Sequence, residues 1–131
     1  MHEKIAKLKE LTLLFVEDED DLIEIISDTL KKLESNFLTA RNGQEALEIL
    51  SDNNVDIVIT DINMPVMNGL DMIENLRKLY PTLPVIVMSA HTETEYIKKA
   101  EELGVKNYLI KPFDFIKFIE LVASMDLKNG N

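Results

Sequence analysis

The chain has no cysteine among its 131 residues. A disulfide framework and a thiolate site are therefore excluded, and the sequence says nothing about redox compartment. No apolar run approaches the length that crosses a bilayer, and residues 1–7 lack the apolar core of a signal peptide. We therefore expect a cytoplasmic protein.

Positive charge is also scarce, because 14 lysines and arginines face 24 aspartates and glutamates, for a net charge of −10. This balance argues against nonspecific binding to nucleic acid and against docking on anionic membranes. Internal repeats, low-complexity tracts and interdomain linkers are missing as well. With 46% hydrophobic and 29% charged residues, the composition is that of one globular domain. We expect a charged lead-in over residues 1–10, the domain over 11–125 and a polar tail over 126–131.

What the chain does have is a regular alternation of strand-like and helix-like segments. Apolar, β-branched runs predict five strands, over residues 11–16, 37–41, 55–60, 84–88 and 105–110. Apolar residues at helical spacing follow each run. Such alternation with short connections predicts an α/β fold, in which helices cover both faces of a doubly wound parallel sheet.

Helical spacing also predicts which side chains face the core. These include Ile25 in the first predicted helix, Tyr96 in the fourth, and Phe115 and Ile116 in the last. The fourth predicted helix begins with a capping box over residues 92–95. It is predicted to end at Gly104, a residue type suited to the helix C-terminus.

Chemically active groups follow four of the five predicted strands. Asp61 comes directly after the run 55–60, and Glu17 and Asp18 come after the run 11–16. Ser89 and Lys111 end the last two runs in the same way. Because the carboxyl ends of parallel strands meet at one edge, where open α/β sheets bind ligands, we predict a single site there.

Three carboxylates converging on one crevice repel each other, by roughly 4 kcal/mol per pair at about 4 Å and an effective dielectric constant near 20. A hard cation relieves this repulsion, and a site of oxygen ligands alone favours Mg²⁺ or Mn²⁺. Lys111 and Ser89 offer an ammonium and a hydroxyl for a phosphoryl group. Asp61, between them, could be a nucleophile that forms an aspartyl-phosphate.

Taken singly, each of these residues has an ordinary explanation. The acids at 17–21 could complement the positive end of a helix, and Asp61 could be a turn or cap residue. Ser89 could be a loop hydroxyl, Lys111 a solvated surface lysine and Tyr108 a core aromatic. The coincidence of complementary groups at four strand ends favours a functional site.

Four segments, over residues 13–19, 61–69, 89–90 and 111–113, occur in an order and at spacings that resemble a known family. The chain is similar to the receiver domains of two-component response regulators, of the chemotaxis-receiver kind, over residues 11 to 125. The resemblance implies a flavodoxin-like sheet of five strands in the order 2-1-3-4-5. By analogy, it also implies a cis peptide bond between Lys111 and Pro112.

The resemblance further implies a role for each residue of the site. Asp61 would be the phosphoacceptor and Asp18 a direct Mg²⁺ ligand. Glu17 would bind the metal mostly through water, and the backbone carbonyl of Asn63 would be a further ligand.

Four more residues receive roles from the same resemblance. Ser89 and Lys111 would hold the phosphoryl oxygens, and Tyr108 would act with Ser89 as an aromatic switch. Asn63 and His91 would flank the approach of the water that attacks the aspartyl-phosphate, and would modulate the rate of that metal-assisted attack.

The implied partners are proteins. A histidine kinase or a phosphotransfer protein would donate the phosphoryl group. A downstream protein, or a second copy of the chain, would read the surface formed by the fourth predicted helix (92–103), the fifth strand and the last helix. Such a domain would not be an enzyme acting on other molecules. Its only reactions would be the transfer of a phosphoryl group to itself and the later loss of that group.

Two alternatives remain open at this point. The chain could be a fragment of a longer regulator whose output is a cyclic-dinucleotide synthase, a histidine kinase or a DNA-binding domain. It could also be an aspartyl-phosphate phosphohydrolase, although Asn63 stands where such enzymes place a second aspartate as general acid. An amide cannot transfer that proton, and the chain has no residues for a substrate-binding cap.

Overall fold

The computed structural model describes residues 1–90 and 94–125 of the chain. A single parallel sheet lies at its centre, with strands in the order β2-β1-β3-β4-β5. The predicted fold class and strand order are both confirmed. The strands are β1 (Thr12–Val16), β2 (Asn36–Ala40), β3 (Ile57–Asp61), β4 (Val85–Ser89) and β5 (Asn107–Ile110).

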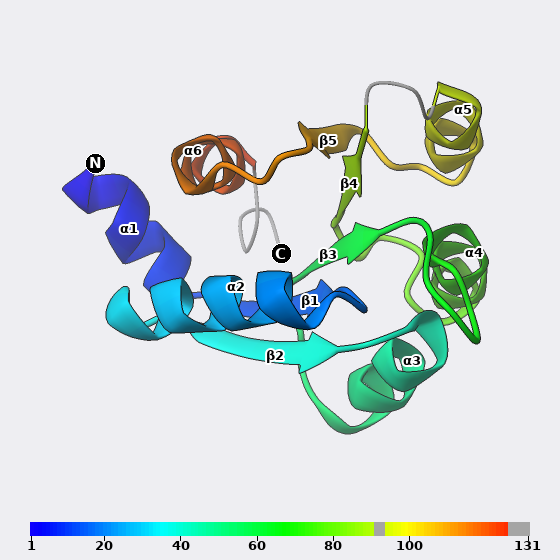
Figure 1. Cartoon of the computed structure of the whole chain (residues 1–131), viewed down its shortest axis with the longest axis horizontal. Coiled ribbons are helices and arrows are strands. Elements are labelled where there is room, and N and C mark those ends of the chain that lie inside the picture. The colour runs from blue at the N-terminus through cyan, green and yellow to red at the C-terminus, as the bar shows by residue number, and fades with distance from the viewer. Residues whose placement is uncertain (91–93, 126–131) are drawn as a thin grey trace.

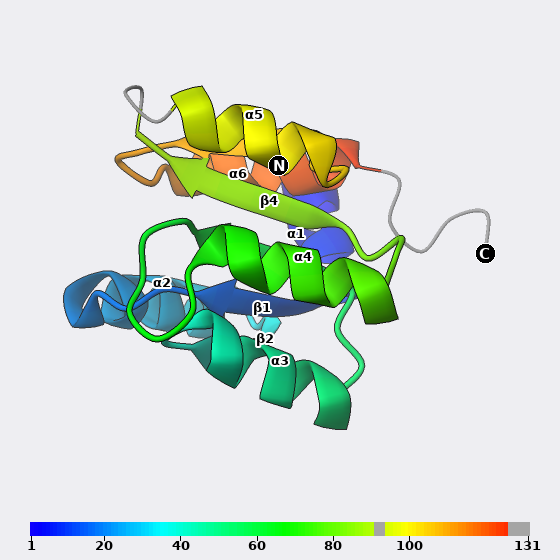
Figure 2. The ribbon, with the colours of Figure 1, turned by 90° about the vertical axis from the view of Figure 1, so that its right-hand side faces the viewer.

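Helices cover both faces of this sheet. They are α1 (His2–Lys9), α2 (Asp20–Lys32), α3 (Gly43–Asp52), α4 (Gly69–Leu79), α5 (Thr94–Glu102) and α6 (Phe115–Ser124). Helices α3, α4 and α5 lie on one face, while α1, α2 and α6 lie on the other (Figures 1 and 2). Strands β3 and β4 are buried along their full length because both faces are covered. Within the described residues, no helix combines the length and apolar character needed to cross a bilayer.

Side-chain caps set where three of the helices begin. The side chains of Asn42, Asn68 and Asp114 accept hydrogen bonds from backbone N–H groups in the first turns of α3, α4 and α6. Gly104 follows the end of α5 with φ of +85°, as expected of a C-terminal glycine. The predicted capping box over residues 92–95 falls partly outside the described residues.

Three predictions of buried side chains are wrong. A helix resting on a sheet buries only part of its circumference, and other residues occupy the inner positions of these helices. Ile26 in α2, Ala100 in α5 and Phe118 in α6 are fully buried. Their neighbours at the margin of the apolar stripe are exposed: Ile25 by 57%, Tyr96 by 40% and Ile116 by 60%.

Helix α1 lies in the segment that the sequence marks only as a charged lead-in. Leu8 at its end and Leu11 just beyond it are buried, in the same core cluster as Phe118 of α6. The ammonium of Lys7 donates hydrogen bonds to the carbonyl oxygens of Ala123, at 2.8 Å, and Met125, at 3.3 Å. The last turn of α6 has no basic residue of its own, so Lys7 supplies the positive charge that its C-terminal carbonyls favour.

We therefore predict that Lys7→Met, which keeps the apolar stem, lowers the free energy of unfolding by about 1–2 kcal/mol, because two charge-assisted hydrogen bonds are lost. Urea denaturation measures this change. Lys4→Met is the matched control, since among the described residues the Lys4 ammonium contacts only Glu120, in an exposed ion pair at 3.5 Å, a type of contact that contributes about 0–1 kcal/mol. Equal effects of the two substitutions would contradict the assigned role of Lys7.

Candidate functional site

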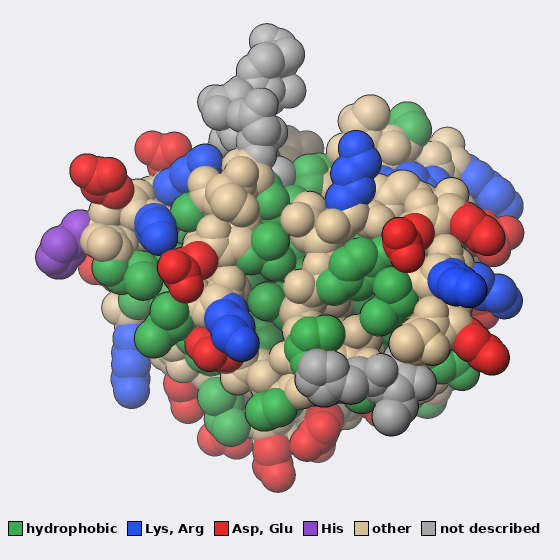
Figure 3. Space-filling model, turned by 90° about the horizontal axis from the view of Figure 1, so that it is seen from above, with side chains coloured by type: hydrophobic (Ala, Val, Ile, Leu, Met, Phe, Trp, Pro, Cys, Tyr) green, Lys and Arg blue, Asp and Glu red, His purple; other side chains and the backbone are tan. Residues whose placement is uncertain are grey.

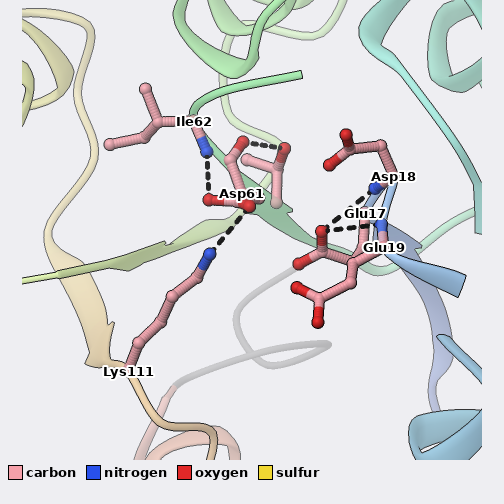
Figure 4. A network of polar contacts seen from close by, with 7 residues as sticks. Glu17, Asp18, Glu19, Asp61, Ile62 and Lys111 are labelled. Carbon is pink, nitrogen blue, oxygen red and sulfur yellow. Dashed lines mark hydrogen bonds and ion pairs between the residues drawn. The ribbon is translucent and has the colours of Figure 1, made fainter. Parts of the chain in front are cut away.

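The four strand ends meet at one edge of the sheet, as predicted. Asp61 is the last residue of β3 and lies beside Met88 of β4. Glu17 and Asp18 follow directly after β1, and Ser89 ends β4. Lys111, directly after β5, reaches across β4 toward Asp61 (Figure 4).

Both oxygens of the Asp61 carboxylate are engaged, and the residue is only 6% exposed. Oδ1 accepts a hydrogen bond from the backbone N–H of Ile62 at 2.8 Å. Oδ2 lies 2.8 Å from the ammonium of Lys111, which forms an ion pair with it (Figure 4). The carboxylate is thus held in one orientation by a backbone donor and a cation.

The backbone around Asp61 is fixed by residues that the sequence analysis did not single out. The buried hydroxyl of Thr60 donates to the Asp61 carbonyl oxygen at 2.7 Å. The N–H of Gly69 donates to the Ile62 carbonyl at 2.7 Å, and a Cβ at Gly69 would lie 2.2 Å from the Asp61 carbonyl oxygen. Only glycine allows the turn after β3 to return so closely. In the sequence, the glycine at the end of the segment 61–69 was the feature that could have indicated this tight turn.

The three acids do converge. Glu17, Asp18 and Asp61 each offer a carboxylate oxygen within 4.8 Å of the others, and Asp18 is the exposed member. Oε2 of Glu17 accepts hydrogen bonds from the N–H groups of Asp18, at 3.0 Å, and Glu19, at 3.1 Å. Oε1 of Glu17 is buried and, among the described residues, has no hydrogen-bond partner.

This environment disfavours the charged form of Glu17. Burial raises the pKa of Glu17 to about 7, and the nearby charge of Asp61 adds to the shift, while the N–H of Glu19 opposes it. A buried carboxylate oxygen without a donor is suited to a cation. The cluster contains oxygen ligands alone, so the residues fit Mg²⁺ or Mn²⁺.

Ser89 lies at the same edge with its hydroxyl unused. The side chain is fully buried, and its Oγ has no hydrogen-bond partner within the part of the chain that the structure describes. The backbone N–H of Lys111 donates to the Ser89 carbonyl at 2.9 Å, which ties the two residues together. A buried hydroxyl without a partner is costly, by about 1–3 kcal/mol, and is best explained by a ligand that it serves.

Tyr108 connects β5 with α5. Its hydroxyl donates to the carbonyl oxygen of Val105 at 3.0 Å or of Ile97 at 3.4 Å. Burial raises the pKa of Tyr108, and the charge of Glu101 contributes. The Lys111–Pro112 peptide bond is cis, which confirms that prediction. Of the other predicted site residues, Asn63 is exposed in the turn after β3, and His91 lies outside the described residues.

The raised pKa of Glu17 predicts a pH-dependent stability for the metal-free protein. Between pH 4.5 and about 7 the folded state holds a proton that the unfolded state has released. The free energy of unfolding therefore falls as pH rises through this window, by roughly 3 kcal/mol from this group. Glu17→Gln should remove the fall and make the protein more stable than wild type at pH 8 in EDTA.

Denaturant unfolding across pH measures this difference, with Glu48→Gln as the control because Glu48 is exposed on α3. Parallel pH profiles for wild type and Glu17→Gln would contradict the assigned pKa.

Comparison with known proteins agrees with this geometry. The family model of the response regulator receiver domain matches residues 13–123. The response regulator protein FleR of Pseudomonas aeruginosa is 36% identical over 110 residues, which are 84% of this chain and 23% of FleR. A cyclic di-GMP phosphodiesterase of Thermotoga maritima is 31% identical over 119 residues, which are 91% of this chain and 32% of that protein.

Solved structures show the same fold. A response regulator receiver protein from Pseudomonas putida superposes with a TM-score of 0.81 at 31% identity, covering 88% of this chain and 97% of that one. The chemotaxis response regulator CheY4 of Vibrio cholerae gives 0.76 at 28% identity, covering 86% of this chain and 98% of that one. The chain spans about a quarter to a third of the length of the two curated relatives. It belongs to the receiver domain family of two-component response regulators.

Proposed function

We propose that Asp61 accepts a phosphoryl group from the phosphohistidine of a histidine kinase or phosphotransfer protein. The observation that carries this proposal is the setting of one carboxylate. Asp61 is buried, is paired with Lys111 at 2.8 Å, and lies within 4.8 Å of the carboxylate oxygens of Glu17 and Asp18. That arrangement joins a nucleophile, a cation ligand set and a phosphate-binding ammonium in one crevice.

In the transfer, a carboxylate oxygen of Asp61 bonds to phosphorus as the phosphorus–nitrogen bond of the donor breaks, and the departing imidazole keeps the electron pair and takes up a proton. The ammonium of Lys111 and the hydroxyl of Ser89 then hold phosphoryl oxygens. The carboxylates of Glu17, Asp18 and Asp61 and the backbone carbonyl of Asn63 would hold Mg²⁺ or Mn²⁺. That ion, when bound, neutralises charge on the phosphoryl oxygens.

The domain acts on itself and on no separate substrate. Asn63 is exposed beside the site, and its amide cannot serve as the general acid of a phosphohydrolase. Asn63 and His91 instead modulate the rate at which water removes the phosphate. These two side chains set the lifetime of the signal.

Phosphorylation changes a surface formed by α5, β5 and α6, and a partner binds to that surface. Phosphoryl oxygens draw the Ser89 hydroxyl toward Asp61, and Tyr108 rotates inward as space opens beside β4. The surface carries three exposed apolar side chains, Tyr96, Ile110 and Ile116, and Figure 3 shows apolar groups gathered across this face. A switch requires that phosphorylation favour the active arrangement by a few kcal/mol.

The partner at this surface is a protein or a second copy of the chain. Relatives of this segment include a DNA-binding transcriptional regulator and a cyclic di-GMP phosphodiesterase, each about three to four times longer than the matched segment. Receiver domains of this family are therefore joined to output domains with different activities. This variety favours signalling by contact with another protein over a catalytic activity of the receiver domain itself. The charge of −10 disfavours contact of this domain with DNA or anionic membranes. The cytoplasmic location stays a prediction.

Incubation with acetyl phosphate and Mg²⁺ should add one phosphoryl group to the wild-type protein and none to Asp61→Asn, as measured by intact mass. Asp71→Asn is the control, because Asp71 is exposed in the first turn of α4 and should leave phosphorylation unchanged. Phosphorylation that persists in Asp61→Asn would place the acceptor elsewhere. A wild-type protein that stays unmodified with Mg²⁺ bound would refute the proposed function.

A further inference from the structure

Four of the five phenylalanines of the chain pack together in one cluster, and one of them, Phe113, lies two residues after Lys111. Phe113 contacts the other three, with ring centroids 5.9 Å from Phe15, 4.8 Å from Phe115 and 5.6 Å from Phe118. Its ring meets Phe15 and Phe115 nearly edge to face, at interplanar angles of 69° and 76°. Aromatic pairs in such arrangements contribute about 0.5–1.5 kcal/mol each beyond their buried area.

Phe113 lies in the connection between the lysine and the last helix. At one end of this connection, Lys111 is held by its backbone bond to Ser89 and its ion pair with Asp61. At the other end, Asp114 caps the first turn of α6. Between them, Pro112 is exposed, while Phe113 is partly buried and packs against the core cluster. The aromatic ring therefore anchors this connection to the body of the domain.

The ring partners of Phe113 link the loop that carries Lys111 to the strand that precedes Glu17 and Asp18. Phe15 is 1% exposed in β1, two residues before Glu17, so the contact of Phe113 with Phe15 ties the lysine-bearing loop to the strand that ends in acids. Phe118 is fully buried in α6 and contacts both of these rings. The packing of these rings thus joins the connection that follows Lys111 to the strand that precedes Glu17 and Asp18.

We propose that Phe113 is a positioning residue for the phosphorylation of Asp61, because it holds the Lys111 ammonium where it meets the incoming phosphoryl group. This inference rests on the proposed function and adds a residue that is neither a metal ligand nor a phosphoryl-binding group. An ammonium on a flexible stem is effective only when its backbone is fixed. A displacement of about 1 Å at a reacting centre can reduce a rate by about 100-fold.

A double-mutant cycle between Phe113 and Lys111 separates positioning from general packing. The rate of phosphorylation by acetyl phosphate is measured for wild type, Phe113→Ala, Lys111→Met and the double variant. We expect Phe113→Ala to slow phosphorylation about tenfold in the wild-type background and less than twofold in the Lys111→Met background. Equal slowing in the two backgrounds would overturn the proposal.

Controls keep the result specific to the loop. Phe37→Ala truncates the remaining phenylalanine, which packs against the same core outside the ring cluster, and should change the rate less than twofold. Phe113→Tyr, which retains the ring, should restore most of the rate, and Phe113→Leu replaces the alanine variant if that protein does not fold. Mg²⁺ affinity should be unchanged in the Phe113 variants, because the acids of the cluster lie at the ends of β1 and β3, whose backbones are paired with each other in the sheet.

A loss of Mg²⁺ affinity that matches the loss of rate would show a collapsed site and would overturn the positioning role. Failure of wild type to accept any phosphoryl group is a different result, because it would refute the proposed function before the cycle begins.

Discussion

Mutual repulsion of Glu17, Asp18 and Asp61 is the constraint around which this edge of the molecule is arranged. Their carboxylate oxygens lie within 4.8 Å of one another, and two of the three side chains are buried. Repulsion of this kind amounts to several kcal/mol at the effective dielectric constant of a protein site. The Lys111 ammonium offsets part of it at Asp61, while burial, together with the charge of Asp61, raises the pKa of Glu17. The site is thereby set to bind further positive charge.

The fold serves this arrangement by fixing the ends of its strands. Buried β3 and its neighbours β1 and β4 hold the backbones of the acids and of Ser89 in register, and Gly69 lets the turn after β3 pack against the Asp61 carbonyl. Lys111 directly follows the edge strand β5, and its connection to α6 is held by aromatic packing. The acids thus follow central strands of the sheet, while Lys111 follows an edge strand and is tied to the core by a backbone hydrogen bond to Ser89 and by aromatic packing.

The sequence alone predicted the sheet and the meeting of the strand ends, because both depend on local periodicity and on the general topology of parallel sheets. It could not show that Ile25, Tyr96 and Ile116 are exposed, since helical spacing does not reveal how much of a helix its neighbours cover. Helix α1 was missed because a short, charged segment becomes stable only through its contacts with α6, some 116 positions away in sequence. The role of Phe113 was hidden for the same reason, as its ring partners lie in β1 and α6.

We propose that the three acids form a cation site and that Asp61, one of them, is the phosphoacceptor. Crystals soaked in Mn²⁺ test it through the anomalous scattering of the ion. We expect one strong peak bonded to the carboxylates of Asp18 and Asp61 and to the backbone carbonyl of Asn63, with Glu17 nearby. A peak elsewhere, or no peak at this cluster at saturating Mn²⁺, would contradict it.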